Sequence, residues 1–460
     1  MKNYCLSLAL LFVSGCSFLD SNYVKPTVNL PNKWAAQDPG TKINTQVNLP
    51  DLAWWQEFDD PVLANLIKVA LEHNNQVQIA LANLDYAKGQ LKQVQLNWLP
   101  NLSFLAGYSS FPAFGGIDYF FGLMPSYTLN IFAQLKQQKQ AKYLVEASTY
   151  AKDSTRLTVI GQVAASYFSL SAQTEQRQLY QQLLADMTKQ LTLYQSQFKS
   201  GLIDLSKIDD LQSQIKQVKA QTNIVEHNWI VSQNALRFLA NQNPGYVQLT
   251  KGFSQLDGNK IILGTLPLNV VNNRPDVKHA EAMLKAASAN IGLAHSQLLP
   301  SVNLSSFFLD STHSLTKAGT PTNLNQAYAT LPILNAPALG QIAASNASFK
   351  AAYYEYVQTI RGVLRDVDND LSAHNWYSQQ FKDNLSAMAE LVDSCKLEQS
   401  RYKNGISSRI EVVNCQIKID SLALTLNQNK LQLLMTIVAL YQDLAGGYNA
   451  APHNQINKKH

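Results

Sequence analysis

The sequence has 460 residues, and its 37 Lys and Arg exceed its 32 Asp and Glu by only five charges. So small a surplus, without a concentrated basic stripe, does not indicate a nucleic-acid partner. The eight His are scattered with no H-x-x-x-H spacing, and neither a phosphate-binding loop nor a nucleophile motif occurs. We therefore expect no metal, no cofactor and no enzymatic activity.

The N-terminal residues have the pattern of a bacterial lipoprotein signal. Lys2 precedes a short apolar run, 5–13, and small residues then lead to Cys16. A run this short is typical of a signal peptide and not of a membrane span. We expect residues 1–15 to be removed and Cys16 to carry fatty acids such as palmitate, which bind a membrane at roughly 0.8 kcal/mol per buried CH₂. The alternative is an ordinary signal peptide in which Cys16 occurs by chance.

The residue after Cys16 predicts in which membrane the fatty acids on Cys16 insert. Ser17 stands where lipoproteins retained in the inner membrane usually carry Asp, so we expect the outer membrane. Residues 16–59 would then be a lipid-anchored N-terminal extension. No later segment reaches the eighteen uninterrupted apolar residues of a transmembrane helix. Further contact with the bilayer therefore requires β-strands.

For the next part of the chain, residues 60–242, the sequence pattern predicts a helix, then two strands, then two long helices. Proline at Pro100 ends the first helix, period-two alternation marks the strands, and Gly201 ends the first long helix as a C-cap would. At 1.5 Å per residue the first long helix is about 100 Å long. The expected elements are a helix at 61–98, strands at 102–110 and 121–131, and helices at 134–199 and 205–239.

The second part, residues 268–445, repeats this order after a linker at 243–267. Its long helix has a heptad seam that ends at Gly405. The expected elements are a helix at 274–298, strands at 302–308 and 327–334, the seam helix, and a returning helix at 409–444. Residues 446–460 form a C-terminal tail.

The two halves of the sequence also resemble each other. Leu99 and Pro100 recur as Leu299 and Pro300 at an offset of 200, and the residues around Gly201 recur at an offset of 204. This period is far too long for a solenoid, so it indicates a duplicated domain.

Four strands per chain cannot form a membrane structure alone, because closed barrels start at about eight strands and lipid does not tolerate open sheet edges. We therefore predict a mainly α fold with a small β part, whose duplicated halves form, as a homotrimer, a twelve-stranded transmembrane β-barrel on a long α-helical barrel. Such an assembly is a pore. The rival interpretation, a non-channel coiled-coil tether lipoprotein, leaves the duplicated strand pairs without a purpose.

Several short motifs, in this order, resemble TolC-like outer-membrane factors of the lipoprotein branch, the OprM/NodT type. The resemblance covers about residues 23–448. The motifs are Tyr23-Val24-Lys25-Pro26, Trp54-Trp55-Gln56-Glu57-Phe58 with Asp60-Pro61, Asn273-Arg274-Pro275-Asp276-Val277, Leu299-Pro300-Ser301, Arg401-Tyr402 before Gly405, and Ala439-Leu440-Tyr441.

The resemblance implies a lipid-anchored channel of the cell outer membrane that extends into the periplasm. It implies docking to a periplasmic adaptor (membrane fusion) protein and, through it, to an inner-membrane transporter. The implied function is the exit duct of a tripartite efflux pump, which passes small toxic compounds or drugs to the cell exterior and contributes to multidrug resistance. The alternative within the family is the outer-membrane channel of a type I protein secretion system.

The resemblance also implies roles for residues at the two glycine turns. Gly201, Gly405, Tyr402 and Lys207 would lie at the periplasmic tips that dock the adaptor. In the family, acidic residues six and nine positions after the second glycine surround the entrance, and these positions are Glu411 and Asn414 here. Three Glu411 carboxylates would attract cations, whereas Asn414 would make the inner ring neutral. The alternative is a solvated hairpin tip.

The family's salt-bridge lock does not carry over, because this chain has Lys207 and Ser407 at the positions of its acid and its arginine. Two further cysteines, Cys395 and Cys415, lie ten residues before and ten after Gly405. The oxidising periplasm permits a disulfide there, provided that the Cα atoms approach to about 4.4–6.8 Å. The alternative is two free cysteines in a helix interface.

Overall fold

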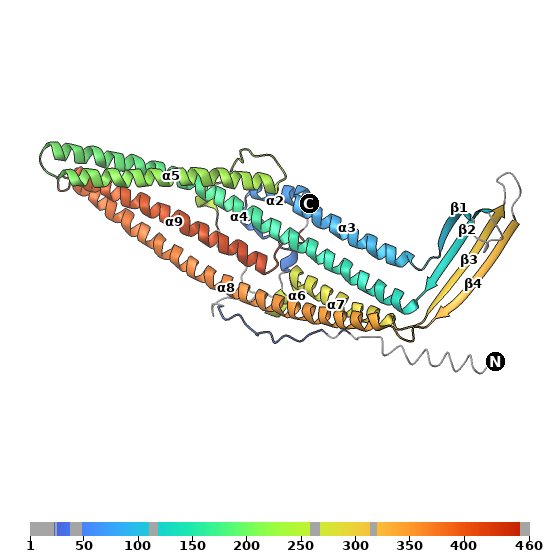
Figure 1. The fold of residues 1–460 in the computed structure, drawn as a ribbon. Coiled ribbons are helices and arrows are strands. Elements are labelled where there is room, and N and C mark those ends of the chain that lie inside the picture. The colour runs from blue at the N-terminus through green and yellow to red at the C-terminus, as the bar shows by residue number, and fades with distance from the viewer. Residues whose placement is uncertain are drawn as a thin grey trace, which may run out of the picture. The chain divides into compact units, whose positions relative to one another are not determined.

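The computed structural model describes residues 23, 25–36, 48–109, 118–257, 267–312 and 320–450 (Figure 1). Two short 3₁₀ segments at Leu49–Asp51 and Trp54–Phe58 precede the first half, and a third lies at Phe253–Gln255. The first half comprises α2 (Pro61–His73), α3 (Asn75–Leu96), β1 (Asn101–Ser109), β2 (Asp118–Leu129), α4 (Ile131–Lys199) and α5 (Leu205–Leu239). The second comprises α6 (Pro267–Asn273), α7 (Pro275–Ser296), β3 (Ser301–Thr312), β4 (Thr320–Thr330), α8 (Ala336–Lys403) and α9 (Arg409–Asp443).

The bounds of these elements reproduce the sequence repeat. Helix α7 begins and ends 200 residues after α3 (275 − 75 and 296 − 96), and α9 begins and ends 204 residues after α5 (409 − 205 and 443 − 239). The mainly helical fold with one small sheet, and its duplication, are therefore confirmed.

The expected single helix at 61–98 is wrong, because Asn74 divides it. The backbone of Asn74 is extended (φ −62°, ψ 129°), and its Oδ1 accepts a hydrogen bond from Gln76 N at 2.8 Å, as an N-cap does. Its Nδ2 donates to Leu239 O at 2.9 Å. In the second half, helix α6 precedes the expected helix start near 274, and Pro275 begins α7.

Both long helices begin at an asparagine that the helical periodicity did not reveal. Asn130 Oδ1 accepts from Ala133 N at 3.0 Å, and Asn335 Oδ1 accepts from Ala338 N at 3.3 Å. Each asparagine thereby satisfies one of the free N–H groups of a first helical turn. The two caps are 205 residues apart, so this start signal is duplicated as well.

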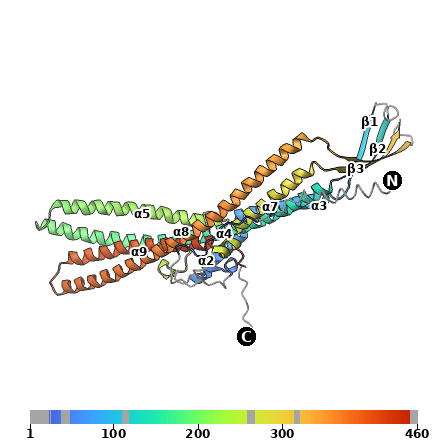
Figure 2. The same ribbon diagram turned by 90° about the horizontal axis from the view of Figure 1, so that it is seen from below.

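The four strands form one antiparallel sheet in the order β1-β2-β3-β4 (Figure 2). The fourth strand was expected at 327–334, but it ends at Thr330 because Pro332 cannot donate to the ladder. Most exposed apolar side chains of the first three strands share one face, although Leu105 lies on the other. Those on the shared face are Leu102, Phe104, Tyr119, Phe121, Leu123, Val302, Leu304 and Phe308. In β4 the exposed Leu324 and Tyr328 pair with Phe307 and Asn303, on the opposite face.

Contacts divide the chain into two compact units that each contain parts of both halves. The first consists largely of Leu81–Ala151 and Asp276–Ile360, with the sheet, and the second of Asn29–Ala80, Lys152–Pro275 and Arg361–His460. Among the described residues, no helix is long and apolar enough to cross a membrane.

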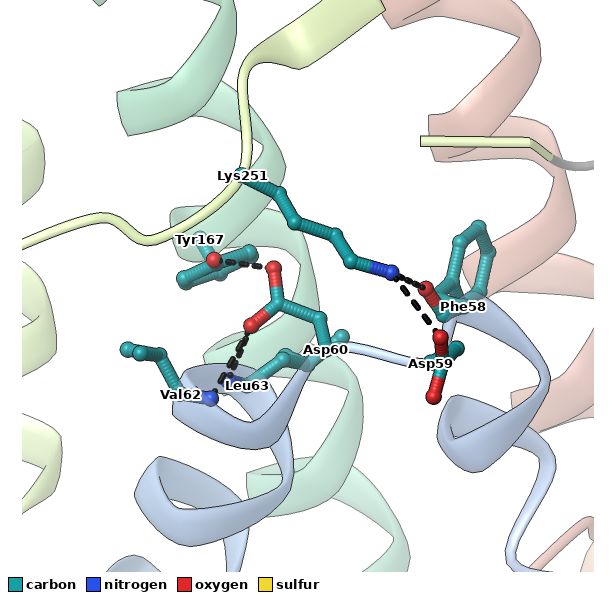
Figure 3. A network of polar contacts seen from close by, with 7 residues as sticks. All are labelled: Phe58, Asp59, Asp60, Val62, Leu63, Tyr167 and Lys251. Carbon is teal, nitrogen blue, oxygen red and sulfur yellow. Dashed lines mark hydrogen bonds and ion pairs between the residues drawn. The ribbon is translucent and has the colours of Figure 1, made fainter. Parts of the chain in front are cut away.

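The hydrophobic core of the second unit holds the aromatic motif near the N-terminus. Trp54 is 1% exposed and stacks on Tyr441 of α9, with ring centroids 4.9 Å apart and planes 4° apart. Asp60 caps α2 by accepting from Val62 N at 2.9 Å, and the Tyr167 hydroxyl of α4 donates to its other oxygen (Figure 3). Lys251 Nζ donates to Phe58 O and pairs with Asp59, at 3.3 Å each. These contacts tie α4 and α9, which carry the hairpin tips, to the same core.

Candidate functional site

The second unit contains two helical hairpins, α4 with α5 and α8 with α9, whose turns lie at the same end of the unit (Figures 1 and 2). Gly201 (φ +71°) and Gly405 (φ +72°) are the turn residues. Gly201 N donates to Phe198 O and Leu202 N to Gln197 O, both at 2.9 Å. In the same way, Gly405 N donates to Tyr402 O at 3.0 Å, and Ile406 N donates to Arg401 O at 2.9 Å. Both turns are Schellman motifs, which need a residue in the left-handed region and therefore favour glycine.

The residues expected at the entrance lie on the first turns after Gly405. Glu411 is exposed, and its Oε2 accepts from Asn414 Nδ2 at 3.4 Å. Asn414 Oδ1 accepts from Gln190 Nε2 of α4 at 2.6 Å. Glu411 and Asn414 are thus brought together, and Asn414 also joins the second hairpin to the first.

Lys207 lies on the other hairpin, exposed in the first turn of α5. Ser407 contacts Glu398 of α8 through its hydroxyl, and Arg401 pairs with the same carboxylate at 3.4 Å. Tyr402 is 37% exposed beside the glycine turn.

Cys395 of α8 and Cys415 of α9 form a disulfide, with Cα atoms 5.6 Å apart. This separation is within the range that a disulfide requires. The bond joins the two helices of the second hairpin across a loop of 20 residues. Cys16, the expected lipidation site, lies outside the described residues.

The sequence-based site prediction missed two carboxyl pairs in this unit. Asp420 of α9 is 4% exposed, and it faces Asp186 of α4. A signal for Asp420 was available: Ile410, Ile417 and Leu424 are spaced by seven, and Asp420 occupies an intermediate position of that apolar seam.

The second pair lies at the C-terminal end of α9. Asp370 of α8 faces Asp443, and burial, followed by this contact, raises the pKa of Asp370 to about 8. Arg274 Nη1 donates to Asp443 Oδ1 at 2.9 Å and to its carbonyl oxygen at 2.7 Å. The Arg274 guanidinium thus holds both the side chain and the backbone of Asp443 beside Asp370. Within the described residues, no group of three His, Cys, Asp or Glu is arranged to hold a metal ion.

This arrangement of duplicated helices, strand pairs and glycine-capped hairpins is the fold of outer-membrane channel proteins. The structure of the open state of the Neisseria gonorrhoeae MtrE outer membrane channel matches with a TM-score of 0.82, covering 94% of this chain and 99% of that one at 23% identity. The sequence matches the profile of the outer membrane efflux protein family over residues 66–242 and 266–446, and the chain belongs to this family.

Sequence relatives agree with this assignment. The solvent efflux pump outer membrane protein SrpC of Pseudomonas putida is 26% identical, over 96% of this chain and 98% of the relative. The probable outer membrane lipoprotein SilC of Salmonella typhimurium is 24% identical, over 96% of this chain and 98% of the relative. The expected family, the efflux function and the outer-membrane location are confirmed.

Proposed function

We propose that three copies of this chain form the exit duct of a tripartite efflux pump. The observation that carries this proposal is the sheet, in which β1 and β4 are the outer strands of a single chain. Each presents an edge that lies unpaired among the described strands, and lipid does not tolerate such edges. Three chains supply twelve strands, which can close with every edge paired and with the apolar face of β1, β2 and β3 toward lipid.

The helical hairpins support the rest of the pump architecture. In the proposed trimer they continue the duct into the periplasm, where their exposed tips dock a periplasmic adaptor protein linked to an inner-membrane transporter. The cargo is small toxic compounds, in line with the solvent efflux named for SrpC. The duct passes cargo without chemical change, so we propose no enzymatic activity and no cofactor.

The lipid anchor belongs to the same proposal. Cleavage before Cys16 leaves residues 16–59 as a lipid-anchored extension, followed by the repeats at 60–242 and 268–445, the linker at 243–267 and the tail at 446–460. SilC, described as a probable outer membrane lipoprotein, supports the anchor by analogy. Metabolic labelling with a fatty acid should mark the wild type and not Cys16→Ala, and labelled Cys16→Ala would contradict it.

We further propose that Glu411 and Asn414 line the periplasmic entrance. Both lie within ten residues of the Gly405 turn, and Glu411 is exposed. The Cys395–Cys415 bond holds the helices of this hairpin together, so the entrance would widen by movement of the hairpin as a unit. Thiol labelling of unreduced, denatured protein checks the bond: two reactive thiols at these positions would rule it out.

Two measurements on detergent-solubilised, full-length protein test the duct. Light scattering corrected for detergent should give three times the mass of the mature chain. Reconstitution into a planar bilayer should give discrete conductance steps. A stable monomer that forms pores would contradict the proposal, because four strands cannot close.

A further inference from the structure

The buried carboxyl group of Asp420 belongs to neither the turn nor the proposed entrance. Gln416 Nε2 donates to Asp420 Oδ1 at 3.0 Å. Asp420 Oδ2 is buried and has no hydrogen-bond donor among the residues that the structure describes. A buried carboxylate oxygen without a donor is costly, whereas a protonated one can itself donate. Its neighbour across the helix interface is the Asp186 carboxylate.

Apolar side chains pack beside Asp420 along the helix interface. Ile417 and Leu424, three residues before and four after Asp420, pack against a buried cluster of α4 and α5 side chains. The buried members of this cluster are Leu183, Met187, Leu211 and Ile215. Two ionised carboxylates in such a place would repel each other with little screening by water, so one of them is expected to keep its proton.

The two carboxyl groups have different polar neighbours. Lys189 Nζ lies 2.5 Å from Asp186 Oδ1, so an ammonium group faces that carboxylate. Burial, followed by the nearby Asp186, raises the pKa of Asp420, while the Gln416 hydrogen bond and the Lys189 ammonium act in the opposite direction. Asp420 is therefore the member that binds the proton and Asp186 the member that accepts its hydrogen bond.

A second polar contact joins the same two helices nearer the tip. Gln190 is four residues beyond Asp186 on α4, and Asn414 is six residues before Asp420 on α9. Gln190 donates to Asn414 at 2.6 Å. The two contacts follow one another along the α4–α9 interface and end at the residues proposed for the entrance.

We propose that Asp186 and Asp420 share one proton and act as a latch between the two hairpins of each chain, closed when the proton is bound and loosened when it leaves. This rests on the proposed function, because it assigns a consequence for the entrance of the duct. It also supplies a contact between hairpins in a chain whose Lys207 and Ser407 cannot form the family's salt bridge.

The sign of the pH dependence follows from the pKa of Asp420, which is raised above the ordinary aspartate value of about 3.9. Stabilisation from the shared proton is complete below that ordinary value, and it is lost as the pH rises through the raised pKa. Above that point the two carboxylates repel, α9 separates from α4, and the entrance widens. Conductance should therefore increase as the pH rises.

The experiment is single-channel conductance of the full-length trimer in a planar bilayer, titrated from about pH 4 to about pH 8, the range above the ordinary aspartate pKa. The wild type should conduct more as the pH rises. Asp420→Asn, which has the shape and donor capacity of the protonated acid, should lose this pH response and stay at the low-pH conductance. Asp186→Asn should also lose the response, because titration of the pair requires both carboxyl groups.

Asp210→Asn is the matched control, since it removes one exposed carboxylate from α5 of the same hairpin tips. It should keep the wild-type pH response. A flat wild-type titration, or an Asp420→Asn channel that titrates like the wild type, would overturn the latch. Absence of channels from wild-type trimers would instead contradict the proposed duct, so the two failures are distinguishable.

Discussion

The two hairpin tips have the same backbone and different side-chain chemistry. Their turn glycines have φ values of +71° and +72°, and their Schellman bonds match one for one. At the repeat offset of 204, however, Cys395 and Cys415 take the positions of Leu191 and Leu211. In the first hairpin Leu211 is buried in the apolar cluster with Leu191 packed against it, whereas in the second a disulfide joins the same two positions.

The turn and the interface between the two helices of a hairpin differ in how many chemical solutions each allows. The left-handed turn accepts few residues other than glycine, so it stayed the same in both halves. The interface between two helices can be held by apolar packing or by a covalent bond, and the two hairpins use different ones. The charged positions diverged as well, because Lys207 and Glu411 occupy the same place in the repeat.

Truncating Leu211, in the buried apolar cluster of the first hairpin, should have the greatest effect on stability. Leu211→Ala should destabilise the first hairpin by about 2–5 kcal/mol, the usual cost of truncating a buried leucine. Hydrogen exchange followed by mass spectrometry should show faster exchange at the tip of α4 and α5, and little change in α8. Leu205→Ala, at an exposed position of the same helix, is the control and should cost less than about 0.5 kcal/mol. Equal losses of protection in the two hairpins would show that Leu211 does not stabilise the first hairpin selectively.

The disulfide should matter only in the second hairpin. Cys395→Ser with Cys415→Ser should lower its stability against local opening by about 3 kcal/mol, the entropic value for a loop of about this length. Exchange should accelerate around Gly405, and the first hairpin should be unchanged. Adding reductant to the wild type should reproduce the effect, and adding it to the double variant should have none. Unchanged exchange around Gly405 would show that packing alone holds the hairpin.

The glycine turns should respond alike. Gly201→Ala and Gly405→Ala should each cost about 1–2 kcal/mol, because each places a Cβ in the left-handed region while nothing else lies within 4 Å of it. Gly89→Ala in α3 is the control, since it also has open space around it and should stabilise by about 0.5–1 kcal/mol. Thermal unfolding of the trimer measures all three. A turn that tolerates alanine would not be the constraint that kept both backbones alike.

Replacing the charged residues Lys207 and Glu411, which share one position of the repeat, should change stability least and channel selectivity most. Glu411→Ala should raise single-channel conductance and lower cation preference, since it removes three carboxylates from the proposed entrance. Lys207→Ala should not lower cation preference, because it removes positive charge. Reversal potentials in a salt gradient provide the measurement. Identical selectivity in both variants would place the constriction elsewhere.

The repeat, the strand pairs, the long helical hairpins and the glycine at each hairpin turn could be predicted from the sequence alone. These features depend on local signals: period-two and heptad patterns, proline at Pro100 and Pro300, and glycine at the two hairpin turns. It also indicated the cysteine pair, because residues ten before and ten after a hairpin turn come to similar heights. The family followed from motifs distributed along the chain.

Features that depend on a partner far away in the chain became visible only once the helices and strands were packed together. Asn74 interrupts a helix with a side chain that bonds Leu239 O, 165 residues away. The apolar residues of β4 lie on the opposite face because the ladder with β3 sets their register. Asp420 meets Asp186 only because α9 packs on α4. Periodicity along one helix shows which face is buried, but which residue faces it depends on how two helices are rotated and shifted against each other.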